Sequence, residues 1–439
     1  MFMIFRGKTS LSPSDAASVS HRSRPGLIKK IPAWGLLFLF GLLLGKQVST
    51  GAAKGGAAST TLSSRLEKGL KYLHVADTTG FTVSDAAEFG AASSTELRTV
   101  AAVRTAAATG STTLGADAAA GTTALTVADN TGFAQHDYLT IGAGATLEVH
   151  KVASVASTDT INLTDGLINA QANGSNVVEV TNVLEVNLPT ARAHAAAAAV
   201  VERQAPYTHA LTPCDLADLP WATIERSVAG LLVNRFEDVR IQRIAISGEA
   251  GQPITLNVSY LAIDEERQVS AQSATYEAND PFIFWMGTYT VDGSDISSKV
   301  NQFNLELINV FHEADQTHEH IRAHIPLIRR DVELSWTMKF DAIARYAETY
   351  LGAAAGTESQ ETIAMSSGAL SIDLSYGADT AERGLKVEIP GVYHTVAAVE
   401  LDSGSTESQE YACEGHARKI AGSELVEVTI KNAEAGKYA

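Results

Sequence analysis

The sequence predicts a mainly β protein: a β-sandwich or barrel-like domain with one packed α-helix, preceded by small β-rich inserted repeat domains. Three observations support this fold class. Apolar and polar residues alternate in short runs after residue 237, a short motif recurs between residues 71 and 133, and one helical period appears at 341–352. Hydrophobic residues make up 45% and charged residues 19% of the chain, which excludes wholesale disorder.

Residues 1–55 form a basic and hydrophobic head. They hold eight of the 33 Lys and Arg residues but one of the 50 Asp and Glu residues, which leaves −24 on the remainder of a chain whose net charge is −17. Lys29 and Lys30 precede an apolar run at 31–45 that reaches ~22 Å, short of a ~30 Å hydrocarbon core. This layout is typical of a signal peptide. A short membrane anchor is the second interpretation, and a stretch added by a misplaced start codon is the third and the one that we favour.

A repeated motif, VAD-x-TGF, defines the next region at 56–183. It stands at 75–81 and again 52 positions later at 127–133. Each copy continues into short β-rich runs punctuated by Gly, Asn and Asp, which predicts a two-unit β domain with a thin core. We expect this domain to decorate a larger body. Loops that bind a carbohydrate or a receptor are the alternative.

Residues 184–236 are expected to form a linker and an extended arm. The run at 191–200 is mostly Ala, which suits a short helix or a flexible linker. The proline-containing run at 204–220 shows no long hydrophobic period, so it predicts an extended, wrapping segment.

Alternation dominates 237–439. The strand at 329–340 places five apolar side chains on one face: Val332, Leu334, Trp336, Met338 and Phe340. In the strand at 238–248, the period places Ile241 on the face of Arg243, opposite Ile244. Trp285 and Trp336 are expected to be core or interface anchors.

The period changes at 341–352. Asp341 suits an N-cap, Gly352 suits a C-cap, and apolar residues between them recur at three and four positions. One amphipathic helix between strands predicts a helix packed on a sheet.

The order of these elements resembles the tail tube protein of long-tailed, non-contractile bacteriophages. The resemblance covers roughly residues 210–439 and rests on the order of its pieces: LTPCDLADLPWATIERSV at 211–228, VRIQRIAISGEAGQPITLNVSYLAID at 239–264, PF-x-F followed by DG at 281–293, VNQFNLELINVF with its Asn309, RDVELSWTMKFD at 330–341 and LKVEIPGVYH at 385–394. Two features depart from the family. A hydrophobic N-terminus has no role in a virion protein assembled in cytoplasm, and the repeat insertion is larger than usual, which suggests domains on the exterior of a tube.

The resemblance implies a virion structural protein that self-assembles into stacked rings, commonly hexamers, forming the tail tube as a conduit for DNA. It further implies assembly in the host cytoplasm, tape-measure and tail tip or terminator proteins as partners, and DNA that passes through the lumen without specific binding. No stable membrane partner is expected. The alternative function is a secreted or surface-anchored β-rich adhesin that binds glycans.

Catalytic, cofactor and metal sites find little support. P-loop, G-x-S-x-G and dinucleotide-binding patterns are missing from the sequence, and two cysteines, Cys214 and Cys413, exclude a Cys₄ zinc site. We therefore predict no enzyme and no cofactor. His318, His320 and His324 are candidate zinc ligands, but they lack the helical His-Glu-x-x-His spacing, so no metal site is assigned.

The same loop is the candidate contact between rings or subunits. It joins two predicted strands and is rich in charge, which is typical of a solvated loop. The residues assigned to this contact are His312, Glu313, Asp315, His318, His320 and Arg322.

Overall fold

The structure is a computed structural model that divides into two compact units. Unit 1 comprises mainly Met1–Gln47 with Ala210–Asn432, and unit 2 comprises mainly Val48–His209 with Ala433–Lys437. The residues described are 2–8, 26–28, 33–91, 94–105, 108–156, 159–215, 219–228, 232–268, 281–291, 293–311, 327–339, 368–377, 382–399, 410–433 and 435.

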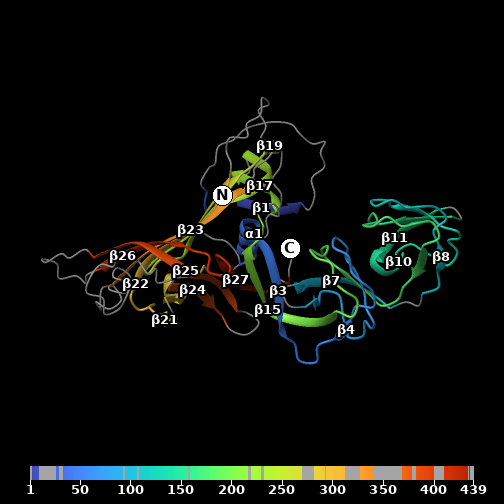
Figure 1. The fold of residues 1–439 in the computed structure, drawn as a ribbon, viewed down its shortest axis with the longest axis horizontal. Helices are drawn as coiled ribbons and strands as arrows, with labels where there is room; N and C mark the ends of the chain where they lie inside the picture. The colour runs from blue at the N-terminus through green and yellow to red at the C-terminus, as the bar shows by residue number, and fades with distance from the viewer. Residues whose placement is uncertain are drawn as a thin grey trace. The chain divides into compact units, whose positions relative to one another are not determined.

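Unit 1 is a sandwich of two antiparallel sheets, which confirms the mainly β fold class (Figure 1). In the first sheet the strands lie in the order β2 (Gly26–Ile28), β18 (Thr255–Leu261), β17 (Leu232–Glu249), β22 (Val300–Phe311), β23 (Leu327–Lys339) and β26 (Glu410–Ala417). The second contains β21 (Ser294–Asp295), β20 (Gly287–Val291), β24 (Gly368–Tyr376), β25 (Arg383–Val399) and β27 (Glu427–Asn432). A 3₁₀ turn, η4 (Phe284–Met286), precedes β20.

The strand β25 belongs to both sheets. Its first half pairs with β24 and β27, and its second half pairs with β26. The two sheets are therefore joined along one side, and their inner faces supply a single hydrophobic cluster that includes Leu305, Leu334, Leu374, Val387 and Val428.

The strand β17 continues beyond the sandwich. Its first half pairs with β16 (Trp221–Val228) and β19 (Asp264–Gln268), and β1 (Phe2–Lys8) pairs with β16. The pairing of β17 with β18 shifts register between Ile241 and Arg243. This bulge turns the strand, so Ile241 is buried together with Ile244 and Ile246, and the simple alternation expected across this point is wrong.

A helix, α1 (Ala33–Leu44), supplies part of the unit 1 core. Five of its side chains are buried in the same cluster as the sheets: Leu39, Phe40, Leu42, Leu43 and Leu44. The structure thus groups most of the expected head at 1–55 with unit 1. An apolar run of this length is also typical of a buried helix, and sequence periodicity does not separate that case from a signal peptide.

The helix expected at 341–352 lies outside the described residues. None of the helices in the described part of the chain has the length and apolar composition needed to span a bilayer.

Unit 2 contains most of β3 (Gly45–Ala53) and two six-stranded copies of one small β fold, the last strand of which, β15 (Ala199–Pro213), ends in unit 1. The first copy contains β4 (Ser59–Thr61), β5 (Tyr72–His74), β6 (Ala86–Phe89), β7 (Glu96–Arg104), β14 (Val183–Val186) and β15 (Ala199–Pro213). The second contains β8 (Ser111–Thr113), β9 (Ala124–Thr126), β10 (Tyr138–Ile141), η2 (Gly144–Thr146), β11 (Glu148–Ala156), β12 (Thr160–Leu163) and β13 (Asn176–Glu179).

The Ala-rich run at 191–200 forms turns, a bridge at His194 and the start of β15 rather than a helix. The pairing of Ala199 and Val200 with β4 overrides the helix propensity of alanine.

The recurring motif forms the same turn in both copies. Asp77 Oδ1 accepts a hydrogen bond from the backbone N–H of Thr79 at 2.9 Å, and Asp129 Oδ1 accepts one from Thr131 at 2.9 Å. The glycines that follow have φ of +89° and +90°, where a side chain is disfavoured. The motif is therefore an Asx turn followed by a left-handed glycine.

Candidate functional site

One face of the sheet β18–β17–β22–β23–β26 is polar. The register places Asn257, Ala245, Glu306, Glu333 and His416 side by side in one row across the five strands. The neighbouring row contains Thr255, Ser247, Asn304, Ser335 and Glu414. The opposite face of the same strands points into the unit 1 core. Because side chains alternate along a strand, core burial on one face determines which residues occupy the other.

This face, which we call the polar face, carries more acid than base. It consists of Thr255, Asn257, Ser259, Arg243, Ala245, Ser247, Glu249, Gln302, Asn304, Glu306, Ile308, Arg329, Asp331, Glu333, Ser335, Thr337, Lys339, Glu410, Ala412, Glu414 and His416. Six of these are carboxylates, two are guanidinium groups and one is an ammonium group.

The corresponding face of the second sheet is closer to neutral. Across β24, β25 and β27 it carries Ser371, Asp373, Ser375, Lys386, Glu388, Glu427, Thr429 and Lys431. These residues include three carboxylates and two ammonium groups. Among the described strands of the sandwich, the polar face is therefore the more acidic outer surface.

An ion pair lies at the centre of the polar face. Arg243 Nε donates to Glu306 Oε2 at 2.7 Å, a second guanidinium nitrogen contacts the other oxygen, and Asn304 Nδ2 donates to Glu306 Oε1 at 3.0 Å. Partial burial opposes ionisation of Glu306, but these hydrogen bonds outweigh it and hold the pKa of Glu306 below its ordinary value. Glu306 thus stays ionised at neutral pH.

Behind the polar face, the sheet is fastened to α1 by a buried amide. Asn309 is 1% exposed, and its Nδ2 donates to Leu43 O at 3.0 Å and to Ile241 O at 3.1 Å. Arg330 Nε donates to Asn309 Oδ1 at 3.1 Å, and the Cys214 N–H donates to Leu44 O at 2.6 Å. These bonds satisfy carbonyls that a helix C-terminus leaves without a partner inside the helix.

The loop predicted to contact other subunits joins β22 to β23. The pair Phe311 and Leu327 stands at its base and packs with Leu219 and Leu261 in a small cluster. The residues assigned to this loop, His312, Glu313, Asp315, His318, His320, His324 and Arg322, lie outside the described residues.

The two tryptophans differ in burial. Trp336 is buried in the unit 1 core, as predicted, whereas Trp285 in η4 is 68% exposed. Trp285 is therefore not a core residue of the single chain, and the interface alternative remains a prediction.

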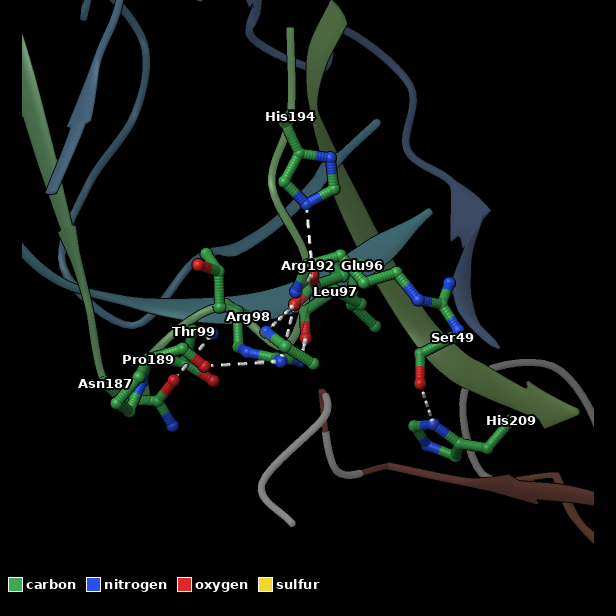
Figure 2. A network of polar contacts seen from close by, with 12 residues as sticks. Ser49, Glu96, Leu97, Arg98, Thr99, Asn187, Pro189, Arg192, His194 and His209 are labelled. Carbon is green, nitrogen blue, oxygen red and sulfur yellow. Dashed lines mark hydrogen bonds and ion pairs between the residues drawn. The ribbon is translucent and has the colours of Figure 1, made fainter. Parts of the chain in front are cut away.

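Unit 2 holds a buried network centred on Glu96 (Figure 2). The Glu96 carboxylate accepts the backbone N–H groups of Ala191 at 3.0 Å and Arg192 at 2.8 Å, lies 3.0 Å from His194 Nε2, and pairs with Arg98 Nη2 at 2.6 Å. Burial opposes ionisation, but these partners outweigh it, so the pKa of Glu96 lies below its ordinary value. The network ties the start of β7 to the segment 189–194, and the Glu96, Arg98 and His194 side chains are buried.

A serine–histidine pair in unit 2 is also structural. Ser49 Oγ lies 2.8 Å from His209 Nδ1, linking β3 to β15 (Figure 2). Both residues are buried, so a substrate has no access to this hydroxyl. Within the described ranges, no three His, Cys, Asp or Glu side chains are placed to hold a metal ion.

Comparison with known families gives one match. A family model described as Phage tail tube protein matches residues 153–430, more than half of the 439 residues. The chain belongs to the phage tail tube protein family. A search of curated proteins found no match. Family membership makes the chain a structural component of the virion tail, as the order of strands predicted.

Sequence reasoning missed two parts of this tail tube domain. It named the segments that form β17, β18, β22 and β23 but not β26. It also missed the row that brings Glu306, Glu333 and His416 together, because that row depends on register between distant segments. It also gave Asn309 no role. A polar residue at a core-facing position of an apolar strand is the signal that was available.

Proposed function

We propose that copies of this chain assemble into closed rings, stacked as the tail tube, and that the polar face lines the lumen. The observation that carries the proposal is the register of five strands, which forms one continuous, acidic surface backed by a hydrophobic core. Strand edges left unpaired in one subunit are removed when neighbouring subunits close a ring.

An acidic lumen suits the passage of DNA. Carboxylates such as Glu333 and Glu414 repel phosphates, so the duplex finds no site at which to bind. At physiological ionic strength this repulsion reaches about 8 Å from the wall. The net charge of −17 is consistent with a conduit that does not hold nucleic acid.

The remaining parts of the proposal follow from the family. The ring is a hexamer, the tape-measure protein occupies the lumen during assembly in the host cytoplasm, and tail tip and terminator proteins cover the ends. The loop between β22 and β23, with His318 and His320, contacts the next ring. Unit 2 projects from the exterior, and the protein uses no cofactor.

Cysteine labelling of the full chain tests the orientation of the polar face. Ser335→Cys places a thiol in the middle of the polar face, and the control Thr429→Cys places one on the outer face of the second sheet. Each variant is assembled, imaged by negative-stain microscopy, and treated with a small maleimide or with a polymer-linked maleimide too large for a lumen. The unsubstituted chain measures labelling of Cys214 and Cys413.

In tubes, the Ser335→Cys thiol should react with the small reagent and not with the polymer, whereas the Thr429→Cys thiol should react with both. Equal reaction of the Ser335→Cys thiol with the polymer before and after assembly would contradict the orientation. A chain that forms neither rings nor tubes would contradict the assembly itself.

A further inference from the structure

We propose that the two copies in unit 2 are nested: the second, inner copy is inserted into a hairpin of the first, outer copy. The first four strands of the inner copy begin 52 positions after the strands that they match in the outer copy: β8 corresponds to β4, β9 to β5, β10 to β6 and β11 to β7. The last two strands of the inner copy begin 23 positions before the strands that they match: β12 corresponds to β14 and β13 to β15. The outer copy therefore resumes only after the inner copy is complete.

Strand register supports this correspondence residue by residue. In the inner copy, β11 pairs with β12 through Ala156–Thr160, Val155–Ile161, Ser154–Asn162 and Val152–Leu163, with one register shift. In the outer copy, β7 pairs with β14 through Arg104–Val183, Val103–Leu184, Ala102–Glu185 and Val100–Val186, with its shift at the same place. The hairpin that is closed by a short connection in the inner copy is the one that holds the insertion in the outer copy.

Buried polar groups repeat with the same offsets. Glu148 accepts the backbone N–H groups of Ile168 at 2.7 Å and Asn169 at 2.6 Å, as Glu96 does from residues 23 positions further on. Glu179 accepts the Gly110 N–H at 3.0 Å, and Glu202 accepts the Ala58 N–H at 3.1 Å. Each copy thus carries a complete set of these contacts.

Two glycines repeat the pattern of close approach. A Cβ on Gly142 would lie 2.3 Å from Gln171 Oε1, and one on Gly90 would lie 2.8 Å from His194 Nδ1. Gln171 and His194 are separated by the same 23 positions that relate the last strands. Side-by-side copies would require a single offset throughout, which these pairs contradict.

The strand pair that leads into unit 2 follows the same rule. Val48 in β3 stands 52 positions before Val100 in β7, which stands 52 positions before Val152 in β11, and β3 pairs with β15 as β7 pairs with β14. The outer copy, which includes the start of β15, is therefore inserted between β3 and the later part of β15, where Ser49 contacts His209, in the way that the inner copy is inserted between β7 and β14.

The junction between the copies is built from residues that do not repeat. Tyr72 donates to Asp165, and Tyr138 donates to Glu185 at 2.7 Å, with the two rings in an edge contact at 5.6 Å. The counterparts of the two tyrosines are Ala124 and Ala86. In a nested pair the outer and inner copies contribute different surfaces to the junction, so the residues at the junction are not expected to repeat.

Nesting makes the two copies unequal in their dependence on one another. All six strands of the inner copy lie within one continuous segment, whereas the outer copy needs β14 and β15 from beyond it. Unfolding the inner copy leaves the outer copy with a long loop, a change that flexible loops tolerate. Breaking β14 unfolds the outer copy and spares the inner one.

Two substitutions at equivalent positions test the proposal in the full chain. Ile161→Asp disrupts the inner core, and Leu184→Asp disrupts the outer core; both side chains are 0% exposed. Trypsin cleavage, followed by mass spectrometry, is measured after Lys151 in the inner copy and after Arg98 in the outer copy.

Ile161→Asp should raise cleavage after Lys151 by about 100-fold and leave Arg98 protected, since cleavage follows the population of the open form. Leu184→Asp should do the reverse. In a side-by-side arrangement, Leu184 belongs to the second copy, so Leu184→Asp would expose Lys151 and spare Arg98. That result, or equal exposure of both sites in both variants, overturns the proposal.

A pair of deletions gives an independent test. Replacing 105–181 with Ser-Thr reproduces the spacing of the inner hairpin, and Asn182, with φ +57°, already suits the last position of a three-residue turn. This chain should keep Arg98 protected, whereas replacing 105–203 in the same way should expose it. Exposure of Arg98 in the first deletion, or its protection in the second, contradicts nesting.

Discussion

The fastening of α1 to the sheet makes a quantitative prediction. In Asn309→Leu, the side chain keeps its branching but becomes larger and loses both donors, so Leu43 O and Ile241 O lose the hydrogen bonds at 3.0 and 3.1 Å. A buried group left without its partner costs roughly 1–3 kcal/mol. Arg330 also loses an acceptor. We expect unit 1 to lose about 3 kcal/mol of its free energy of unfolding.

Tryptophan fluorescence reports this loss selectively, because all four tryptophans lie in unit 1: Trp34, Trp221, Trp285 and Trp336. In a urea titration with a slope of about 3 kcal/mol per M, the midpoint should fall by about 1 M. The control is Asn304→Leu on the polar face, where a half-buried amide donates to Glu306 at 3.0 Å. It should cost less than about 1 kcal/mol.

The comparison of these two variants tests whether the Asn309 amide fastens α1 to the sheet. If Asn309→Leu lowers the midpoint no more than Asn304→Leu does, the amide does not fasten α1, and the account of the unit 1 core fails with it.

Three further predictions concern the two cores. Phe40→Ala, in α1, should cost unit 1 about 3–5 kcal/mol in the same titration, and a shift of less than about 1 kcal/mol would show that α1 is not a core helix. Because the pKa of Glu96 is lowered in the folded state, the ionised carboxylate stabilises unit 2 above about pH 4.5, and this stabilisation is lost as the pH falls through the pKa of the folded state. Glu96→Gln should therefore lower the melting temperature of unit 2 at pH 7. It should also flatten the decline of the melting temperature in acid, which calorimetry measures. Gly142→Ala, whose Cβ would meet Gln171, should destabilise unit 2 by more than about 2 kcal/mol. The control Gly174→Ala has a φ of +84° but open space around its Cβ, so it should cost about 1 kcal/mol. Equal melting temperatures of the two variants would contradict the close approach of Gln171 to Gly142.

The alternation of apolar residues carried the prediction of the fold class and the core strands. Val332, Leu334 and Met338 are buried on one face of β23 as their spacing indicates. Backbone geometry sets a period of two in any strand, so this pattern can be read locally. The Asx turn at Asp77 and Asp129 was likewise visible as a repeated motif, because its hydrogen bonds join residues two apart.

Other features depended on contacts between segments far apart in the chain. Most of the apolar run at 31–45 forms α1, whose last residues are buried in the unit 1 core, and Asn309, more than 260 positions away, donates to the Leu43 carbonyl. The bulge after Ile241 and the row that joins Glu306 to Glu333 follow from register with partner strands, which a local period does not contain.

The sequence alone thus determined the mainly β class, the existence of a repeat and, through the order of its strands, the tail tube family. The tertiary structure decided which carboxylates share a face, where α1 is buried and that the repeat is nested. The physical reason is that local periods arise from the backbone of each segment, whereas pairing partners are selected by the burial of whole faces across the chain.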